Sequence, residues 1–227
     1  MARIMKIDNA IKKRMAQKQG QQERPYNTRS ERKKYLIVCE GERTEPNYFT
    51  SLKKKLPIGL VDIDIEGTGA NTLSLVDIAI KLKHEQAEKA KKSIIHRPYD
   101  HVWAVFDKDD FPDVNFNNAI FKARSNKVKV AYTNEAFELW YLLHFEFHNT
   151  GISRHQYYPL LTRYIGREYA KNAVDMYDLL AEIGNEARAM KWASDLLGQS
   201  NLQNPAASNP STTVHKLIQD LNKFKMA

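Results

Sequence analysis

Acidic side chains follow two apolar segments of the chain directly. Glu40 comes straight after the run Tyr35–Cys39, and Asp107 and Asp109 follow the run His101–Phe106. Short apolar runs of this kind are typical of strands that are buried on both faces of a parallel sheet. Because ligands bind beyond the carboxyl ends of parallel strands, we expect these carboxylates to converge. Several carboxylates in one crevice repel each other, so the pattern calls for a hard cation such as Mg²⁺ or Mn²⁺.

The spacing within each acidic motif supports the same chemistry. Asp107 and Asp109 are one residue apart, so their side chains project to one side wherever extended backbone continues. Such a pair can hold one Mg²⁺ or bridge two in a hydrolytic site, and the sequence leaves the number open. Glu45 completes the metal site or, alternatively, caps the helix expected beside it. Glu40 could instead act as a general acid or base, and Gly41 would allow a sharp turn after the strand.

Apolar runs alternate with amphipathic segments along the first two thirds of the chain. Strands are expected over residues 35–39, 61–65, 101–106 and 127–132. Helices are expected over residues 46–56, 73–92, 117–125 and 135–147. This order predicts an α/β fold, with a mostly parallel sheet flanked by helices. Beyond residue 153 we expect helices only, over residues 157–165, 170–183, 186–197 and 212–224.

The net charge of +8 is confined to the N-terminal residues. Residues 1–34 hold 11 Lys and Arg against three Asp and Glu, whereas the remainder holds 24 of each kind. The composition predicts a flexible basic arm that contacts phosphates, or alternatively a terminus that only improves solubility. The basic residues expected to bind nucleic acid are Lys12, Lys13, Arg14, Arg32, Lys33 and Lys34, with Arg43 after the first strand. We therefore predict three parts: the arm at 1–34, an α/β catalytic domain at 35–150 and a helical subdomain at 151–227.

The remaining composition excludes several classes of protein. A single cysteine, Cys39, excludes a disulfide framework and a thiolate zinc site within one chain. The apolar runs are far shorter than the ~20 residues that a membrane span needs. The N-terminus has no apolar stretch typical of a secretory signal, so we expect a cytoplasmic protein.

Two further features allow more than one interpretation. Glu138 lies within a strongly apolar run, and it either reaches the acidic crevice or pairs with a basic residue. Arginines and tyrosines gather between residues 154 and 169. That mixture fits either a clamp for single-stranded nucleic acid or the ordinary surface of a helical region.

Three segments of the chain resemble the RloB-like family. They are IVCEGERTEPNYF (37–49), FDKDDF through NEAFELWYLLHF (106–145) and NPSTTVHKLI (209–218). The first two look like a Toprim domain, in which an apolar strand ends in Glu-Gly and a later strand ends in Asp-x-Asp. The resemblance spans residues 35–224 and implies a Toprim-like core related to the OLD-family nucleases.

The resemblance also implies residue roles. Glu40 matches the family glutamate at the first strand end, Glu45 matches the second acid of that turn, and Asp107 with Asp109 matches the Asp-x-Asp pair. These matches imply a Mg²⁺-dependent or Mn²⁺-dependent phosphodiesterase of a phage-defence system. By analogy with other small Toprim effectors, the expected substrate is RNA such as tRNA. Lys216, in the third segment, is a candidate for stabilising the departing oxygen, with a solvated helix lysine as the alternative.

The resemblance further implies a partner. RloB-like proteins are typically encoded beside an ABC-type ATPase, and this chain lacks a G-x-x-x-x-G-K-[ST] phosphate-binding loop of its own. Two other functions fit the same residues: a DNA nuclease of this fold, and a non-catalytic subunit that binds nucleic acid or the ATPase until a partner activates it. Nucleotidyl transfer is a weaker third, and the sequence is compatible with a homo-oligomer.

Overall fold

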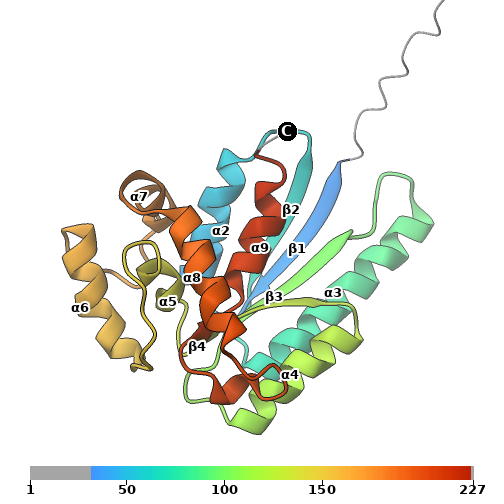
Figure 1. Cartoon of the computed structure of the whole chain (residues 1–227). Helices are drawn as coiled ribbons and strands as arrows, with labels where there is room; N and C mark the ends of the chain where they lie inside the picture. Colours follow the sequence, from blue (N-terminus) through green and yellow to red (C-terminus); the bar gives the residue numbers. More distant parts are fainter. Residues whose placement is uncertain (1–31, 226–227) are drawn as a thin grey trace, which may run out of the picture. The chain divides into compact units, whose positions relative to one another are not determined.

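The computed structural model describes residues 32–225, which build one five-stranded sheet flanked by helices (Figure 1). The strand order is β2-β1-β3-β4-β5. The first four of these strands are parallel, and β5 runs antiparallel to β4. This arrangement confirms the predicted α/β class with a mostly parallel sheet. The strands are β1 (Lys33–Cys39), β2 (Val61–Gly67), β3 (His101–Asp107), β4 (Lys129–Asn134) and β5 (Ser211–Thr212).

The register of the parallel strands brings their carboxyl ends to one edge of the sheet. Cys39 of β1 pairs with Val105 of β3, and Asp107 of β3 pairs with Thr133 of β4. The backbone N–H of Glu40 donates to the Val105 carbonyl oxygen at 2.9 Å, which continues the ladder by one residue. The residues that follow β1 and β3 therefore meet at the same edge.

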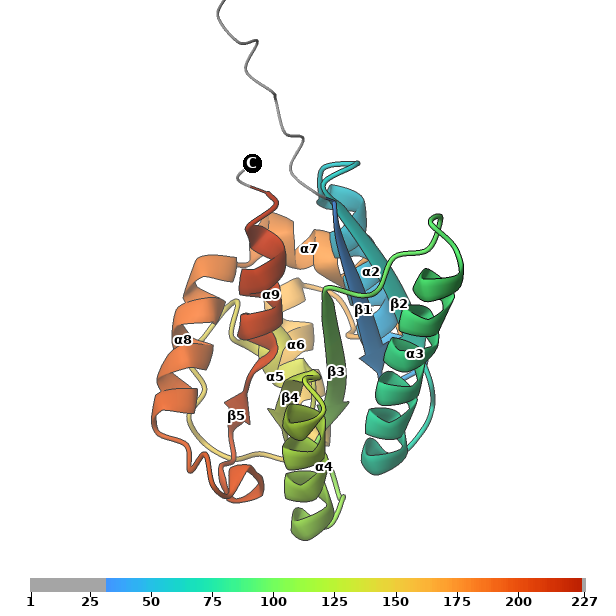
Figure 2. The same cartoon turned by 90° about the vertical axis from the view of Figure 1, so that its right-hand side faces the viewer.

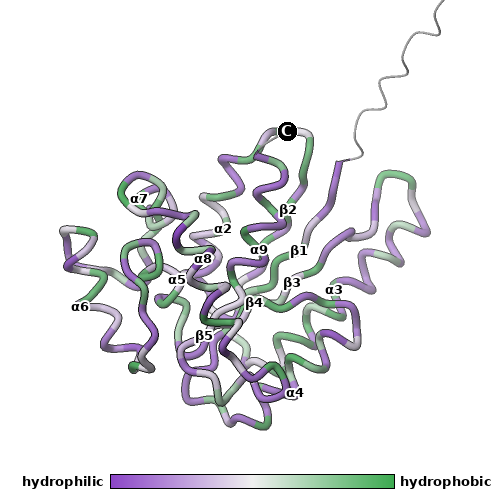
Figure 3. Tube along the Cα trace, in the orientation of Figure 1, coloured by the Kyte–Doolittle hydropathy of each residue, from purple (hydrophilic) through white to green (hydrophobic). Residues whose placement is uncertain are grey.

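Helices cover both faces of the sheet. Alternate residues of β1 and β3 are buried on opposite faces: Leu36 and Phe106 pack against α3 and α4, and Ile37 and Val105 pack in the core of the other face. Apolar and polar stretches alternate along α3 and α4, as expected for helices with one face on a core (Figure 3). No helix among residues 32–225 combines the length and the hydrophobicity needed to cross a membrane. The helices are α2 (Thr44–Lys55), α3 (Thr72–Lys92), α4 (Asp113–Ser125), α5 (Glu138–Leu142), α6 (Arg154–Ile165), α7 (Met176–Ile183), α8 (Glu186–Gly198) and α9 (Val214–Asn222).

The helix expected over residues 135–147 is much shorter in the structure. Only Glu138–Leu142 is α-helical. The backbone N–H groups of His144 and Phe145 donate to carbonyl oxygens three residues back, at 3.1 and 2.9 Å, so the chain tightens into turns there. The prediction failed because the segment is buried almost throughout, and an unbroken apolar run carries no helical periodicity that would mark its ends.

The strand expected over residues 127–132 is displaced by two residues to Lys129–Asn134. The N–H of Val128 donates to the Ala123 carbonyl oxygen at 2.9 Å, so this residue still belongs to the turn that follows α4. Lys127 has a φ of 55°, a left-handed conformation that no strand residue adopts. The alternation of polar and apolar residues in the sequence starts at Lys127, two residues before the extended backbone of β4 begins.

The helix expected over residues 170–183 begins only at Met176. Side chains of α2 capture the backbone that precedes it: Thr44 and Asn47 donate to carbonyl oxygens in residues 171–172, at 2.9 and 3.0 Å. Because these carbonyl oxygens accept hydrogen bonds from α2, they do not form the backbone hydrogen bonds that would extend α7 back to residue 170. No sequence pattern marks such a contact, because its two sides are more than 120 residues apart.

We expected only helices beyond residue 153, but the C-terminal region also contains a short strand. Ser211 and Thr212 form the short strand β5 beside β4, directly before α9 (Figure 2). The hydrophobic core that contains Ile37 of β1 also contains Leu161 of α6 and Leu217 of α9. The predicted boundary between residues 150 and 151 stays a prediction, although the helices beyond it share this core with the sheet.

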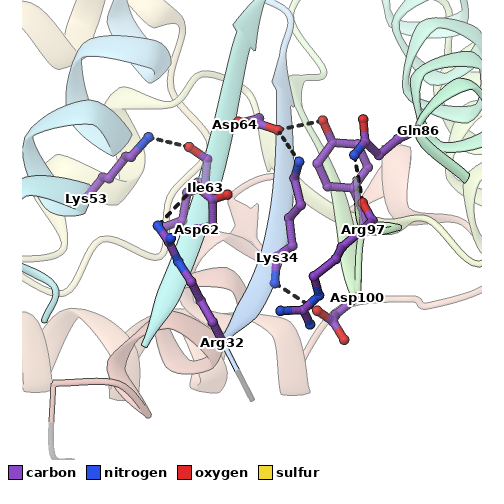
Figure 4. A network of polar contacts seen from close by, with 10 residues as sticks. Arg32, Lys34, Lys53, Asp62, Ile63, Asp64, Gln86, Arg97 and Asp100 are labelled. Carbon is purple, nitrogen blue, oxygen red and sulfur yellow. Dashed lines mark hydrogen bonds and ion pairs between the residues drawn. The ribbon is translucent and has the colours of Figure 1, made fainter. Parts of the chain in front are cut away.

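Ion pairs join the strands at the amino end of the sheet (Figure 4). Arg32 pairs with Asp62 at 3.6 Å and Lys34 pairs with Asp64 at 3.5 Å. The backbone N–H of Lys34 also donates to Asp100 at 2.8 Å. Because β1 begins at Lys33, the last two residues of the arm predicted over 1–34 belong to the sheet. Residues 1–31, with the predicted nucleic-acid contacts Lys12, Lys13 and Arg14, lie outside the described residues.

Candidate functional site

A cleft of about 730 Å³ opens at the carboxyl ends of β1 and β3. The four acids that the sequence singled out, Glu40, Glu45, Asp107 and Asp109, all line it, and so does Arg43. The parallel register explains this convergence, since Glu40 and Asp107 end neighbouring strands. Other residues of the lining include Glu138, Arg154, Lys171 and Asn172.

Glu40 is held between two elements. Thr72, at the start of α3, donates its hydroxyl to Glu40 Oε1 at 3.2 Å. The backbone N–H of Asp107 donates to Glu40 Oε2 at 3.1 Å. Burial raises the pKa of Glu40 above its ordinary value, although these two hydrogen bonds act in the opposite direction. The carboxylate is therefore fixed in orientation at the end of β1 while it is partly removed from water.

Asp107 carries the least satisfied carboxylate of the cleft. Its Oδ2 accepts a hydrogen bond from the Phe137 N–H at 3.1 Å, whereas its Oδ1 is buried without a hydrogen-bond partner among the described residues. Burial raises the pKa of Asp107 well above its ordinary value, and the charges of Glu45, Glu138 and Glu40 raise it further. A buried carboxylate oxygen without a donor is costly, so this atom requires a proton or a cation.

Glu45 lies in the first turn of α2 and is only 5% exposed. Its carboxylate reaches back over Gly41, where a Cβ would lie 2.2 Å from Glu45 Oε2. The chain bends at Gly41 as expected, although its φ is not in the left-handed region. The absence of a Cβ also lets a carboxylate lie against the backbone. Burial raises the pKa of Glu45 to about 7, with further contributions from the charges of Glu138 and Glu40.

Asp109 differs from the other predicted metal ligands. Its carboxylate forms an ion pair with the guanidinium group of Arg154, at the start of α6. Its backbone has a φ of 40°, and its N–H donates to the Glu135 carbonyl oxygen at 3.0 Å. This turn ends the extended geometry that would have placed Asp107 and Asp109 side by side. Asp109 therefore reaches the cleft as part of a charge pair.

The structure decides between the two interpretations of Glu138. Its side chain is 3% exposed and lines the cleft, and its Oε1 accepts a hydrogen bond from the Tyr169 hydroxyl at 2.9 Å. Within the described residues it forms no ion pair. Arg154 and Tyr169 both belong to the segment between residues 154 and 169 that is rich in arginine and tyrosine. That composition was the only sequence feature that pointed to them. Nothing in the sequence pointed to Lys171. Its backbone is held beside the cleft by the hydrogen bond from Thr44 of α2 to the Lys171 carbonyl oxygen.

Several predicted residues do not reach the acidic cleft. Lys216, predicted to stabilise a departing oxygen, lies in the first turn of α9 and lines a different cavity beside β4. The structure does not bring Lys216 to the acidic cleft, because α9 follows an antiparallel strand and runs from Tyr132 towards the amino end of β4. Arg32, Lys33 and Lys34 lie at the amino end of β1, opposite the cleft, and each forms an ion pair with an aspartate.

The cleft offers hard oxygen donors rather than a finished coordination shell. Within residues 32–225, no group of three His, Cys, Asp or Glu side chains is arranged so that it could hold a metal ion. The donor chemistry nevertheless fits Mg²⁺ or Mn²⁺, because Glu40, Glu45 and Asp107 are carboxylates and Asp107 Oδ1 has no other partner. Small side-chain movements would be needed to complete such a site.

The raised pKa values predict how stability depends on pH without a metal. The pKa of Glu45 is raised from 4.5 to about 7, so the folded state binds more protons than the unfolded state in this range. This contribution to stability is complete below pH 4.5 and is lost as the pH rises through 7. The full loss is on the order of 3 kcal/mol. We expect urea unfolding in EDTA to show stability that falls from pH 6.5 to 8.5, and added Mg²⁺ to restore it.

Two buried histidines determine the lower limit of the pH range in which this unfolding measurement reports on Glu45. Burial lowers the pKa of His144 and of His215 to about 4, so protonation of the unfolded chain destabilises the protein as the pH falls below 6.5. Above pH 6.5 this opposing effect fades. The matched control is Glu45→Gln, which should flatten the decline between pH 6.5 and 8.5. An unchanged slope in Glu45→Gln would show that this carboxyl group is not the titrating one.

Comparison with known proteins gives one match. The family model described as RloB-like protein matches residues 35–221, which include every acid of the cleft. No curated protein and no solved structure matches the chain. Since the matched residues make up well over half of the sequence, the chain belongs to the RloB-like protein family.

Proposed function

We propose that this protein is a metal-dependent phosphodiesterase that cleaves nucleic acid at the acidic cleft. The observation that carries the proposal is Asp107, whose buried Oδ1 has no partner while Glu40, Glu45 and Glu138 crowd around it with negative charge. A divalent cation satisfies both conditions, because it neutralises the charge and gives the free oxygen a partner. Membership of the RloB-like family agrees with this chemistry through the motifs that hold the acids.

The residues of the cleft divide into two groups. Glu40, Glu45 and Asp107 would hold the metal ion. A bound Mg²⁺ polarises a phosphate oxygen and lowers the pKa of a coordinated water. Arg43 and Lys171 line the same cleft, and neither side chain forms an ion pair with a described residue. These two cations are therefore free to bind the phosphates on either side of the scissile bond and to hold it over the carboxylates.

The two cations lead to a prediction about substrate binding. Arg43→Gln and Lys171→Gln should each raise KM about tenfold, because each removes a charge-assisted contact to phosphate worth roughly 1.5 kcal/mol. The effect on kcat should be smaller, since neither residue holds the metal. Steady-state kinetics on a short oligonucleotide would measure both constants. Lys55→Gln is the matched control, because Lys55 is paired with Asp178 at 2.8 Å at the far end of α2.

The substrate class needs a direct comparison. RNA such as tRNA, and a role in phage defence, are proposed from the resemblance to small Toprim effectors, whereas DNA remains the alternative within the same chemistry. The experiment incubates the purified full chain and Mg²⁺ or Mn²⁺ with total tRNA, single-stranded DNA and duplex DNA. We expect cleavage of RNA that is lost in EDTA and in Asp107→Ala.

Other results would change the proposal in defined ways. Cleavage of DNA in place of RNA would favour the DNA nuclease. An ABC-type ATPase encoded beside the gene is the proposed partner, so the same substrates should be tested with it and ATP. If no substrate is cleaved with or without the ATPase, while Mg²⁺ binding is demonstrated by calorimetry, the phosphodiesterase proposal fails and the non-catalytic subunit replaces it.

A further inference from the structure

A second cavity, of about 640 Å³, lies beside β4 and shares no residue with the acidic cleft. Its inner wall includes the buried side chains of Trp103, from β3, and Val128, from the turn between α4 and β4. Basic residues from three parts of the chain surround this wall: the end of α4 with its turn, the start of β4, and α9. They are Arg124, Lys127, Lys129 and Lys216.

Most of this positive charge has no counter-charge. Among the described residues of the lining, Asp220 is the only acid. Its carboxylate is already bound by Lys129 and by Lys223, the latter at 2.7 Å. The other three basic side chains of the lining form no hydrogen bond or ion pair with any described residue. The surplus is local, because residues 35–227 together hold equal numbers of basic and acidic residues.

The wall of the cavity adds an unused hydrogen-bond donor. Trp103 is 3% exposed, and its indole Nε1 is buried without a partner among the described residues. The indole N–H can only donate, and the same is true of arginine and lysine side chains. Lys129 lies over the Trp103 ring, 5.1 Å from its centre, so one cation and the indole are neighbours. The Tyr132 hydroxyl, which is also buried without a partner, can donate or accept, and the other unpaired groups of the cavity all require an acceptor.

The position of α9 strengthens this preference for an anion. Thr213 and Lys216 line the cavity at the start of α9, where the helix dipole is positive. Lys216 also has a lowered pKa, because its ammonium group is partly desolvated and lies near the Arg124 guanidinium group. These two cations from separate elements thus repel each other, and neither side chain pairs with an acid among the described residues, so a bound anion would be stabilising.

We propose that this cavity binds a phosphate-bearing ligand of nucleotide size, at a site separate from the acidic cleft. Phosphate oxygens only accept hydrogen bonds and carry the charge that the cavity lacks. The volume lies within the range of about 300–1,000 Å³ that small-molecule sites occupy. The phosphate belongs either to a free nucleotide or to a nucleotide within a strand, and both present the same chemistry to these residues.

Calorimetric titration of the full chain in EDTA tests the proposal without any cleavage. The probes are inorganic phosphate, AMP and a short single-stranded RNA. We expect binding that weakens at least tenfold in Lys216→Gln and in Arg124→Gln, each of which removes one charged donor. Lys122→Gln is the control, because Lys122 lies two residues before Arg124 on α4, outside the cavity, and pairs with Asp77.

A third variant, Trp103→Phe, removes the indole N–H and keeps a smaller aromatic ring in its place. It should also weaken binding, which a purely electrostatic attraction would not explain. Thermal unfolding establishes that each variant is folded, and Arg124→Gln and Lys216→Gln lie on different elements, so one can replace the other.

The probes distinguish the sources of the phosphate. Binding of AMP that the variants weaken identifies a free nucleotide as the ligand. Binding of RNA alone, with a salt dependence that falls by about one unit in Lys216→Gln, identifies a strand. Affinities for all three probes that are equal in the wild type, Lys216→Gln and Arg124→Gln would overturn the proposal. Asp107→Asn should bind inorganic phosphate and AMP like the wild type, so these two arms do not depend on the acidic cleft.

Discussion

Asp107→Asn should reduce metal-dependent cleavage at least ~10³-fold and yet make the metal-free protein more stable. The loss of activity follows from removing a charged ligand of an ion that contributes several kcal/mol to the stabilisation of the transition state. The gain in stability follows from the buried Oδ1 of Asp107, which has no partner and lies among other carboxylates. An amide at this position carries no charge and can donate to Glu45 or Glu40.

The size of this gain should be about 2 kcal/mol at pH 8, the usual penalty for a buried polar group without a partner. Urea unfolding in EDTA measures it, and the same titration with Mg²⁺ should stabilise the wild type but not Asp107→Asn. Asp110→Asn is the matched control, since Asp110 is exposed and does not line the cleft. If Asp107→Asn were less stable than the wild type in EDTA, the unpaired carboxylate would not be the source of strain that we infer.

Gly41→Ala should reduce activity about 100-fold with little loss of stability. The new Cβ would lie 2.2 Å from Glu45 Oε2, well inside van der Waals contact. The side chain of Glu45 can move aside, so the fold survives, but the carboxylate leaves its place in the cleft. Displacement of a catalytic group by about 1 Å typically costs 10²-fold in rate.

A second substitution separates this steric cause from others. In Gly41→Ala/Glu45→Asp the acidic side chain is shorter by one methylene, which relieves the overlap and should recover part of the lost rate. Gly198→Ala is the control, because no atom lies within 4 Å of a Cβ at Gly198, and this variant should keep full activity. Rates are compared with unfolding curves for each variant. Wild-type activity in Gly41→Ala would exclude Glu45 from the catalytic machinery.

The two cavities place opposite charges on different parts of a chain whose residues 35–227 are neutral overall. The acidic cleft lies where β1 and β3 end, and the basic cavity lies beside the amino half of β4. Net charge therefore says little about either site. What matters is that each cavity holds like charges that no described residue pairs with, which is the physical reason to expect a cation at one and a phosphate at the other.

Sequence reasoning succeeded where local patterns suffice. The runs before Glu40 and Asp107 are buried strands because short apolar, β-branched segments bury both faces in a parallel sheet, and parallel strands bring their carboxyl ends together. The α/β class and the meeting of these two acids followed from that. The ends of elements were predicted less well. Burial on all sides removed the periodicity that would mark the ends of the short α5, and the polar–apolar alternation before β4 starts two residues ahead of the strand.

Contacts between distant parts of the chain were decided only by the tertiary structure. The Asp109–Arg154 ion pair and the hydrogen bond from Tyr169 to Glu138 each join residues more than 30 positions apart, and no spacing rule encodes them. The same holds for Lys216, which the chain order could not exclude from the acidic cleft. The sequence determined that Glu40 and Asp107 follow buried strands, because that depends on neighbours along the chain. Which side chain satisfies or opposes a buried charge depends on packing, and only the folded chain specifies that.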